Sequence, residues 1–174
     1  MTIASTTLIF LASCIAMDVR TLRIPNLLTG PAILAGLALN GFCYGWNGFT
    51  ASLAGFGIAV ALLFAPFALG GIGAGDVKMM GAVGALLGPR LLLHSLMVGM
   101  ILGGVIAAVR LAGTARLREK LAATWRMFAN AALSRSLEPL KAPAADPNRV
   151  VLPYSLPLGI GTAGVIAISM VARS

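Results

Sequence analysis

Long apolar runs separated by short polar breaks dominate the chain and predict a bundle of membrane-spanning helices. The runs cover residues 3–17, 25–44, 49–69, 77–87, 91–111 and 150–171. A straight span needs about 20 apolar residues, so the fourth run, from Val77 to Leu87, is too short. Either that helix begins before Asp76, or the bilayer or neighbouring helices accommodate a half-length element.

Proline and glycine mark the breaks between these runs. Pro25 suits the first turn of a helix and disfavours helix at Ile24, so we expect the second helix to begin at Pro25 or Asn26. The segment Gly45–Gly48 is typical of a turn, with Trp46 as an interfacial aromatic. Pro66 predicts a kink in the third helix, and Gly88-Pro89 ends the fourth.

One long segment is polar. Between residues 114 and 149, five apolar positions recur at helical spacing: Leu117, Leu121, Trp125, Phe128 and Ala132. Most basic residues of the segment lie off this apolar stripe. This pattern favours an amphipathic helix on the membrane surface, with a partner-docking helix as the alternative. Three prolines, at 139, 143 and 147, then predict an extended linker.

Composition supports a membrane protein. Of the 174 residues 59% are hydrophobic and 10% charged, and the mean hydropathy is +0.95; a soluble domain has about 25% charged residues. We therefore expect an all-α, polytopic membrane protein of about six transmembrane helices, with residues 1–174 as a single domain and a basic cytoplasmic loop at about 113–149. The first run lacks a basic segment before it, so we interpret it as a span rather than a signal peptide.

The net charge of +8 has a simpler explanation than nucleic-acid binding, because Lys and Arg accumulate in the cytoplasmic loops of membrane proteins. If the loops after the first, third and fifth spans are cytoplasmic, they contain all 13 basic residues except Arg90 and Arg173. Both termini would then lie outside the cytoplasm. Cys14 and Cys43 lie in apolar runs without a C-x-x-C pair, so neither zinc nor a disulfide is expected.

Only five residues are acidic, and Asp18 and Asp76 are the two outside the polar segment. Two membrane crossings separate them, so both should emerge at the cytoplasmic face. Two adjacent carboxylates cannot both ionise cheaply; such a pair can activate water and protonate a leaving amide nitrogen. The alternative is structural: Asp76 caps the fourth helix, and Asp18 pairs with Arg20 or Arg23.

Three motifs resemble those of a known family. Gly73-Ala74-Gly75-Asp76 matches the G-x-G-D pattern of intramembrane aspartyl proteases. With the Asp76-Val77-Lys78 continuation and Asp18 ahead of Arg23-Ile24-Pro25-Asn26, the chain is similar to the type IV prepilin peptidases. The segment from Leu152 to Gly159, which includes Pro153 and Tyr154, is also similar to theirs.

The resemblance implies that Asp18 and Asp76 are the catalytic pair and that Gly73 and Gly75 shape the loop between them. Pro25, Asn26 and Lys78 match the motifs without an assigned chemical step, and Lys78 could equally be a cation extending to the interface. Pro153 and Tyr154 would form the floor of the site, or simply pack in the core.

The implied reaction is removal of the short basic leader of prepilins at the cytoplasmic face of the bacterial inner membrane. The substrate is a transmembrane helix with a basic leader, pilus assembly machinery is a further partner, and no metal, other cofactor or nucleic acid is implied. Paired N-terminal cysteines of larger members are missing. We therefore expect the compact subgroup that serves tight-adherence (Flp-type) pili, and N-methyltransferase activity is not expected.

Two other functions compete with the peptidase. A small ion- or proton-coupled transporter or channel subunit could use Asp18 and Asp76 as ligands and the Gly-rich stretch as a broken helix, although the other half of the chain has no inverted repeat of it. A scaffold of the secretion assembly would need neither aspartate. His94 lies in the fifth run on the outer side, where we expect a structural histidine rather than a catalytic one.

Overall fold

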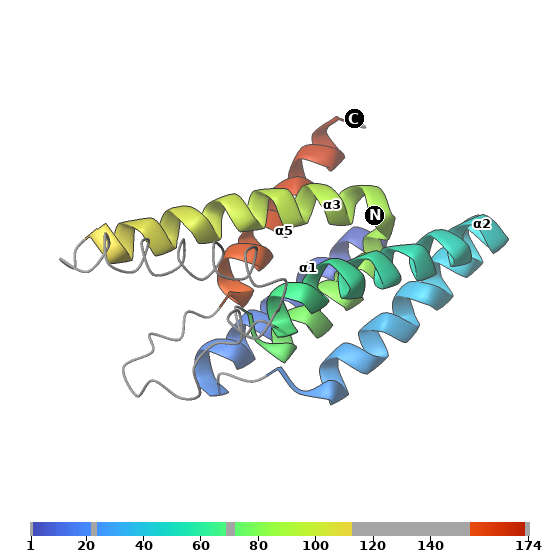
Figure 1. The fold of residues 1–174 in the computed structure, drawn as a ribbon. Coiled ribbons are helices and arrows are strands. Elements are labelled where there is room, and N and C mark those ends of the chain that lie inside the picture. Colours follow the sequence, from blue (N-terminus) through green and yellow to red (C-terminus); the bar gives the residue numbers. More distant parts are fainter. Residues whose placement is uncertain (1, 22–23, 69–71, 113–153, 173–174) are drawn as a thin grey trace, which may run out of the picture.

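The computed structural model describes residues 2–21, 24–68, 72–112 and 154–172, and every regular element in these ranges is a helix (Figure 1). The helices are α1 (Thr2–Thr21), α2 (Asn26–Ala68), α3 (Ala74–Ala112) and α5 (Ser155–Val171). The expectation of an all-α protein is confirmed. The amphipathic helix, the proline linker and Pro153 lie outside the described residues.

Three of these helices, α1, α2 and α3, are long and apolar enough to cross a membrane, and α5 is a shorter apolar helix. The expected start of the second helix is confirmed, because α2 begins at Asn26 and the Pro25 carbonyl accepts from the amides of Leu28 and Thr29. Six membrane spans remain a prediction, since the described ranges contain four helices rather than six separate ones.

Each of the two longest helices is in fact two helices that meet at a glycine. Gly45 in α2 has φ 62° and ψ −148°, and Gly88 in α3 has φ 75° and ψ 177°. Only glycine adopts these conformations without strain. The chain turns back at Gly45 (Figure 1). The breaks expected at Gly45–Gly48 and at Gly88-Pro89 are therefore confirmed in position.

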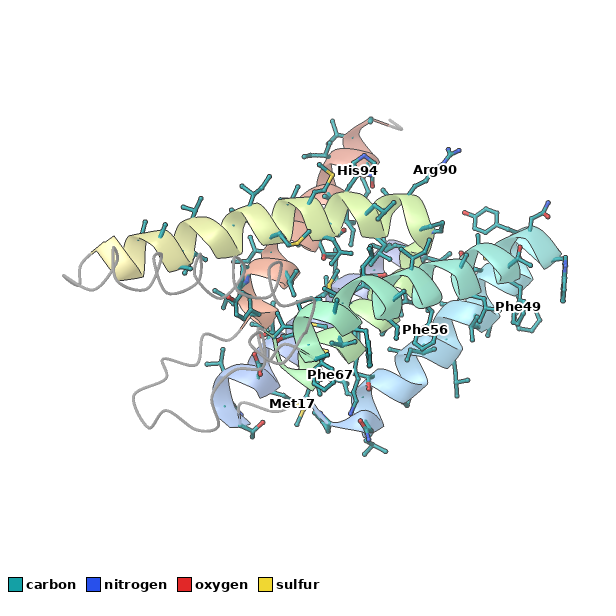
Figure 2. All side chains as sticks on the ribbon, viewed as in Figure 1. Met17, Phe49, Phe56, Phe67, Arg90 and His94 are labelled. Atoms are coloured by element: carbon teal, nitrogen blue, oxygen red, sulfur yellow. The ribbon has the colours of Figure 1, made fainter. Side chains whose placement is uncertain are left out.

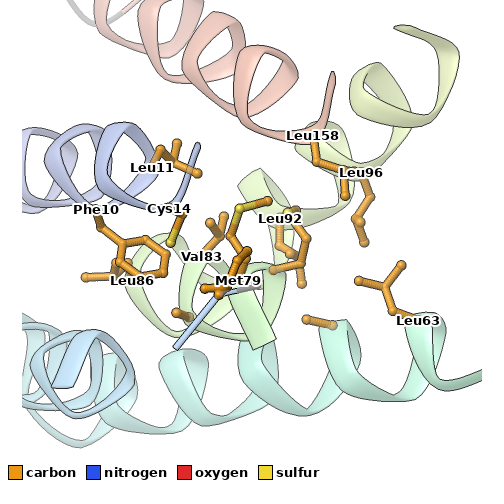
Figure 3. Close-up of a cluster of buried hydrophobic side chains, with 14 residues drawn as sticks. Phe10, Leu11, Cys14, Leu63, Met79, Val83, Leu86, Leu92, Leu96 and Leu158 are labelled. Atoms are coloured by element: carbon orange, nitrogen blue, oxygen red, sulfur yellow. The ribbon is translucent and has the colours of Figure 1, made fainter. Parts of the chain in front are cut away.

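The first half of α3 is the centre of the bundle. All eight residues from Met79 to Leu86 are buried. They pack with Phe10, Leu11 and Cys14 of α1 and Leu63 of α2 (Figure 3). A helix that is apolar on all sides is stable only when other helices enclose it. This explains the short fourth run: the helix begins at Ala74, ahead of Asp76, and its neighbours bury it.

The backbones of α2 and α3 touch at two facing glycines. A Cβ on Gly55 would lie 2.1 Å from the Gly84 carbonyl oxygen, and a Cβ on Gly84 would lie 2.4 Å from that of Gly55. Small residues allow such close packing, which is a main source of helix association in membranes. No larger side chain fits at either position without moving a helix.

Polar side chains of α2 complete the hydrogen bonds at the break in α3. Pro89 has no N–H to donate to the carbonyl of Ala85, one turn earlier. Ser52 Oγ donates to that carbonyl instead, and Asn40 Nδ2 lies 3.1 Å from it and 3.0 Å from the carbonyl oxygen of Leu86. The carbonyls that the break leaves free thus have partners inside an apolar bundle.

Candidate active site

Three helix ends meet around the two aspartates. Asp18 lies in the last turn of α1, Asp76 in the first turn of α3, and Ser155 is the first residue of α5. The side chains of all three are buried, with exposed fractions of 8% for Asp18, 7% for Asp76 and 0% for Ser155. A hydrogen bond joins two of them, because Ser155 Oγ donates to Asp18 Oδ2.

Asp76 caps the helix on which it lies. Its Oδ2 accepts a hydrogen bond of 3.2 Å from the Gly73 amide, and the Gly73 carbonyl accepts from the amides of Asp76 and Val77. This is one half of a capping box, in which the third residue of a helix bonds back to the residue before the helix. The alternative interpretation, that Asp76 caps its helix, is therefore confirmed for one carboxylate oxygen, Oδ2.

Asp18 accepts its hydrogen bond from another helix. Ser155 Oγ, at the start of α5, donates to Asp18 Oδ2. No ion pair joins Asp18 to Arg20, which is exposed, and Arg23 lies outside the described residues. The partner of this carboxylate is thus a hydroxyl that is 137 residues away in the sequence.

The two carboxylates use their oxygens in the same way. Each has Oδ2 fixed by one donor, Ser155 for Asp18 and Gly73 for Asp76. Within the described ranges no residue donates a hydrogen bond to either Oδ1. Because both carboxyl groups are buried, a proton shared between the pair would lower the cost of burying both.

Gly73 and Gly75 fit this site through their small size. Neither is among the glycines of positive φ in the described part of the chain. A Cβ on Gly73 would lie 3.3 Å from Asp76 Oδ2, and a Cβ on Gly75 would lie 3.3 Å from the Ile24 side chain. The glycines therefore let the start of α3 pack tightly against Ile24 and against the Asp76 carboxylate.

Asn26 and Lys78 contact each other beside the pair. Lys78 Nζ donates to Asn26 Oδ1 at 2.7 Å, joining the starts of α2 and α3. Both side chains are at the surface. Pro25 lies next to them and accepts the first hydrogen bonds of α2. These motif residues hold helix ends in place, and none of them donates to either carboxylate in the described ranges.

Tyr154 and His94 are placed by packing rather than by the aspartates. Tyr154 is partly buried against the hydrophobic core, and Tyr154 Cε1 lies 3.7 Å from the place a Cβ on Gly103 would take. His94 Nδ1 lies 2.7 Å from the Arg90 carbonyl oxygen. Figure 2 shows His94 and Arg90 on the opposite side of the molecule from Met17, the residue before Asp18.

Two residues of the site were missed in the sequence. Ser155 lies inside the segment from Leu152 to Gly159 that resembles the prepilin peptidases, but nothing in the sequence joins it to Asp18. Ile24 lies inside another of the motifs, and it is buried against Gly75. Their positions inside the motifs were the only signal that the sequence offered for Ser155 and Ile24. Their contacts could not be predicted, because each contact joins segments that are far apart in the sequence.

The comparisons with known proteins give the family. A model of the type IV leader peptidase family matches residues 5–108. This range includes Asp18, Asp76, Gly73 and Gly75, all of α2, and all of α1 except its first three residues. The chain therefore belongs to the type IV leader peptidase family. The searches of curated proteins and of solved structures returned no match.

Family membership and the apolar helices together define the class of protein. The chain is a membrane protein and a peptidase of the prepilin leader type, in a family whose peptidases are of the aspartic type. The expected resemblance to the prepilin peptidases is confirmed at the level of the family.

Proposed function

We propose that this protein is an aspartic endopeptidase in which Asp18 and Asp76 are the catalytic pair. Its substrate would be a type IV or Flp-type prepilin, cleaved after the short basic leader at the cytoplasmic face of the bacterial inner membrane. N-methylation of the new terminus is not part of the proposal.

The observation that supports the pair most directly is its burial. Asp18 and Asp76 are the only acidic residues in the described ranges, and both are buried at helix ends. A buried charge inside a membrane protein is expensive and usually marks a functional site. Capping alone accounts for Asp76 but leaves the burial of Asp18 beside it unexplained.

The two carboxylate oxygens that have no donor among the described residues suit the hydrolysis of a peptide bond. One carboxylate accepts a proton from water as the water oxygen attacks the scissile carbonyl carbon, and the other, protonated, donates to the carbonyl oxygen. The carbon–nitrogen bond then breaks as the leaving nitrogen takes up a proton. The first carboxyl gives the nitrogen the proton that it took from water, and the second takes a proton from one of the two hydroxyls of the tetrahedral intermediate, so the pair returns to the state in which it began.

The surroundings of the pair suit a basic leader at a membrane boundary. Asp18 and Asp76 lie at helix ends, not in the middle of apolar runs, with the exposed side chains of Arg20 and Lys78 close by in sequence. Basic residues of this kind favour the cytoplasmic side. A prepilin whose transmembrane helix enters the bilayer here would bring its leader junction to the carboxylates.

The test compares three aspartate variants with a prepilin co-expressed in a host without its own leader peptidase. We expect Asp18→Asn and Asp76→Asn each to lower the cleavage rate by at least about 10³-fold, because a neutral amide can neither accept the proton from water nor donate one in its place. Cleavage is measured by the mobility shift of the prepilin.

Asp146→Asn is the matched control, because it makes the same change at the remaining aspartate of the chain, in the polar segment. It should cleave at the wild-type rate. Wild-type cleavage by either Asp18→Asn or Asp76→Asn would contradict the proposed pair.

A further inference from the structure

We propose that Ser155 is a positioning residue that holds the Asp18 carboxylate in the orientation required for cleavage. This inference rests on the proposed function of Asp18. It concerns a residue outside the part of the chain that the family model matches, which ends at residue 108.

The contact between Ser155 and Asp18 is a hydrogen bond between two buried side chains. The Ser155 side chain is completely buried, and its Oγ donates to Asp18 Oδ2. A buried hydroxyl without a partner destabilises the fold, and the Asp18 carboxylate is the partner of this one. The only buried hydroxyl left unpartnered in the described ranges is Ser95 Oγ.

The place of Ser155 in the fold explains why this contact constrains Asp18. Ser155 is the first residue of α5, and the Leu158 amide is bonded to the Tyr154 carbonyl, so the backbone that carries Ser155 is anchored. The next turns pack against α3: a Cβ on Gly161 would lie 2.7 Å from the Gly99 amide nitrogen. A hydroxyl on such a fixed backbone restricts the side chain that it binds.

Among the described residues, Ser155 is the one side-chain donor that fixes the orientation of the Asp18 carboxylate. Within the described ranges Asp18 has no other hydrogen bond from a side chain and no ion pair with Arg20. Loss of the Ser155 hydroxyl would allow the carboxylate to turn and would displace the oxygen that takes part in the proposed reaction. An error of about 1 Å in the position of a reacting group can lower a rate by roughly 10²-fold, so one hydroxyl at this place controls the chemical step.

The test compares Ser155→Thr with Ser155→Val, because these side chains have the same shape and only threonine keeps the hydroxyl. The full-length variants are purified in nanodiscs and assayed with a prepilin whose transmembrane helix follows a short basic leader. We expect Ser155→Val to have a kcat about 10- to 100-fold below that of Ser155→Thr with a similar KM, because rotation of Asp18 affects the chemical step and not substrate binding.

Thr162→Val is the matched control for loss of a hydroxyl. Thr162 is buried on the same helix and donates within it, to the Leu158 carbonyl at 2.8 Å. It should cleave at the wild-type rate. If the added methyl group unfolds both Ser155 variants, Ser155→Ala replaces them and is compared with wild type, with the same expected loss of kcat and unchanged KM.

The outcomes separate this inference from the proposed function. If wild type cleaves and Asp18→Asn does not, equal kcat values for Ser155→Thr and Ser155→Val (or for Ser155→Ala and wild type) overturn the role of Ser155 alone. If Asp18→Asn cleaves like wild type, both the catalytic pair and the role of Ser155 are overturned. A lower kcat for Ser155→Val than for Ser155→Thr, with Thr162→Val unchanged, supports the role.

Discussion

At the scale of single residues, the candidate site combines two buried carboxylates with two polar side chains at the surface. Asp18 and Asp76 are buried and each keeps one oxygen free of described donors. Lys78 and Asn26 are at the surface and bond to each other. A sequence motif contains both kinds of residue, and only burial and hydrogen bonding distinguish them.

We predict that Lys78→Ala lowers cleavage by no more than about 10-fold, far less than Asp76→Asn. Lys78 donates to Asn26 at the surface, and an exposed hydrogen bond of this kind contributes about 1 kcal/mol. Initial cleavage rates of the purified variants measure the effect. Asn26→Ala should cause a similar loss, and the double variant should be no worse than either; a loss as severe as that of Asp76→Asn would contradict this ranking.

Gly75 allows a second prediction at this scale. A Cβ at this position would lie 3.3 Å from Ile24 Cβ and Cγ1 and 3.4 Å from the Ile24 amide nitrogen, so in Gly75→Ala either Ile24 or the start of α3 has to shift slightly. We expect a loss of cleavage of about 10-fold or more, because Asp76 moves with the helix. Gly30→Ala, with nothing within 4 Å of the added methyl group, should not change the rate. Equal rates for both variants would argue against the tight packing.

At the scale of the elements, the break in α3 depends on donors from α2. The Gly88 conformation and the missing N–H of Pro89 leave carbonyls without a helical donor at the end of the buried half of α3. Asn40 and Ser52 supply the hydrogen bonds. Two polar residues in apolar runs thus stabilise a short central helix, a purpose that their own sequence neighbourhoods do not indicate.

We predict that Asn40→Leu destabilises the protein by about 1–2 kcal/mol. The substitution keeps a side chain of similar size but removes the donor to the Leu86 carbonyl, while Ser52 still donates to that of Ala85. Unfolding by SDS in mixed micelles measures the difference. Asn47→Leu, at an exposed position on the same helix, is the control. Equal stability of the two variants would mean that the Asn40 bonds contribute nothing.

At the scale of the whole molecule, a buried half-helix organises the bundle. The other helices surround residues 79–86 of α3, and this arrangement delivers the last turn of α1, the first turn of α3 and the first residue of α5 to one place. Because the site is assembled from three helix ends, a change in packing far from the carboxylates can change their separation. The glycine contact between α2 and α3 is one such place.

The sequence alone was enough for the helices and the candidate acids. Apolar runs and the prolines and glycines between them located the start of α2 and the breaks at Gly45 and Gly88, because these residues act through their own backbone. The scarcity of acidic residues singled out Asp18 and Asp76. Local chemistry of this kind is readable one residue at a time.

Only the tertiary structure decided which groups each carboxylate binds. It showed that Asp76 caps its own helix and that Asp18 takes a hydrogen bond from Ser155, and it placed the short fourth run in the middle of the bundle, where the other helices bury it. These outcomes depend on which helix faces which. The apolar pattern does not specify this, because helices with apolar residues on every side can pack in many rotations, and steric contacts between small residues and a few buried hydrogen bonds select one.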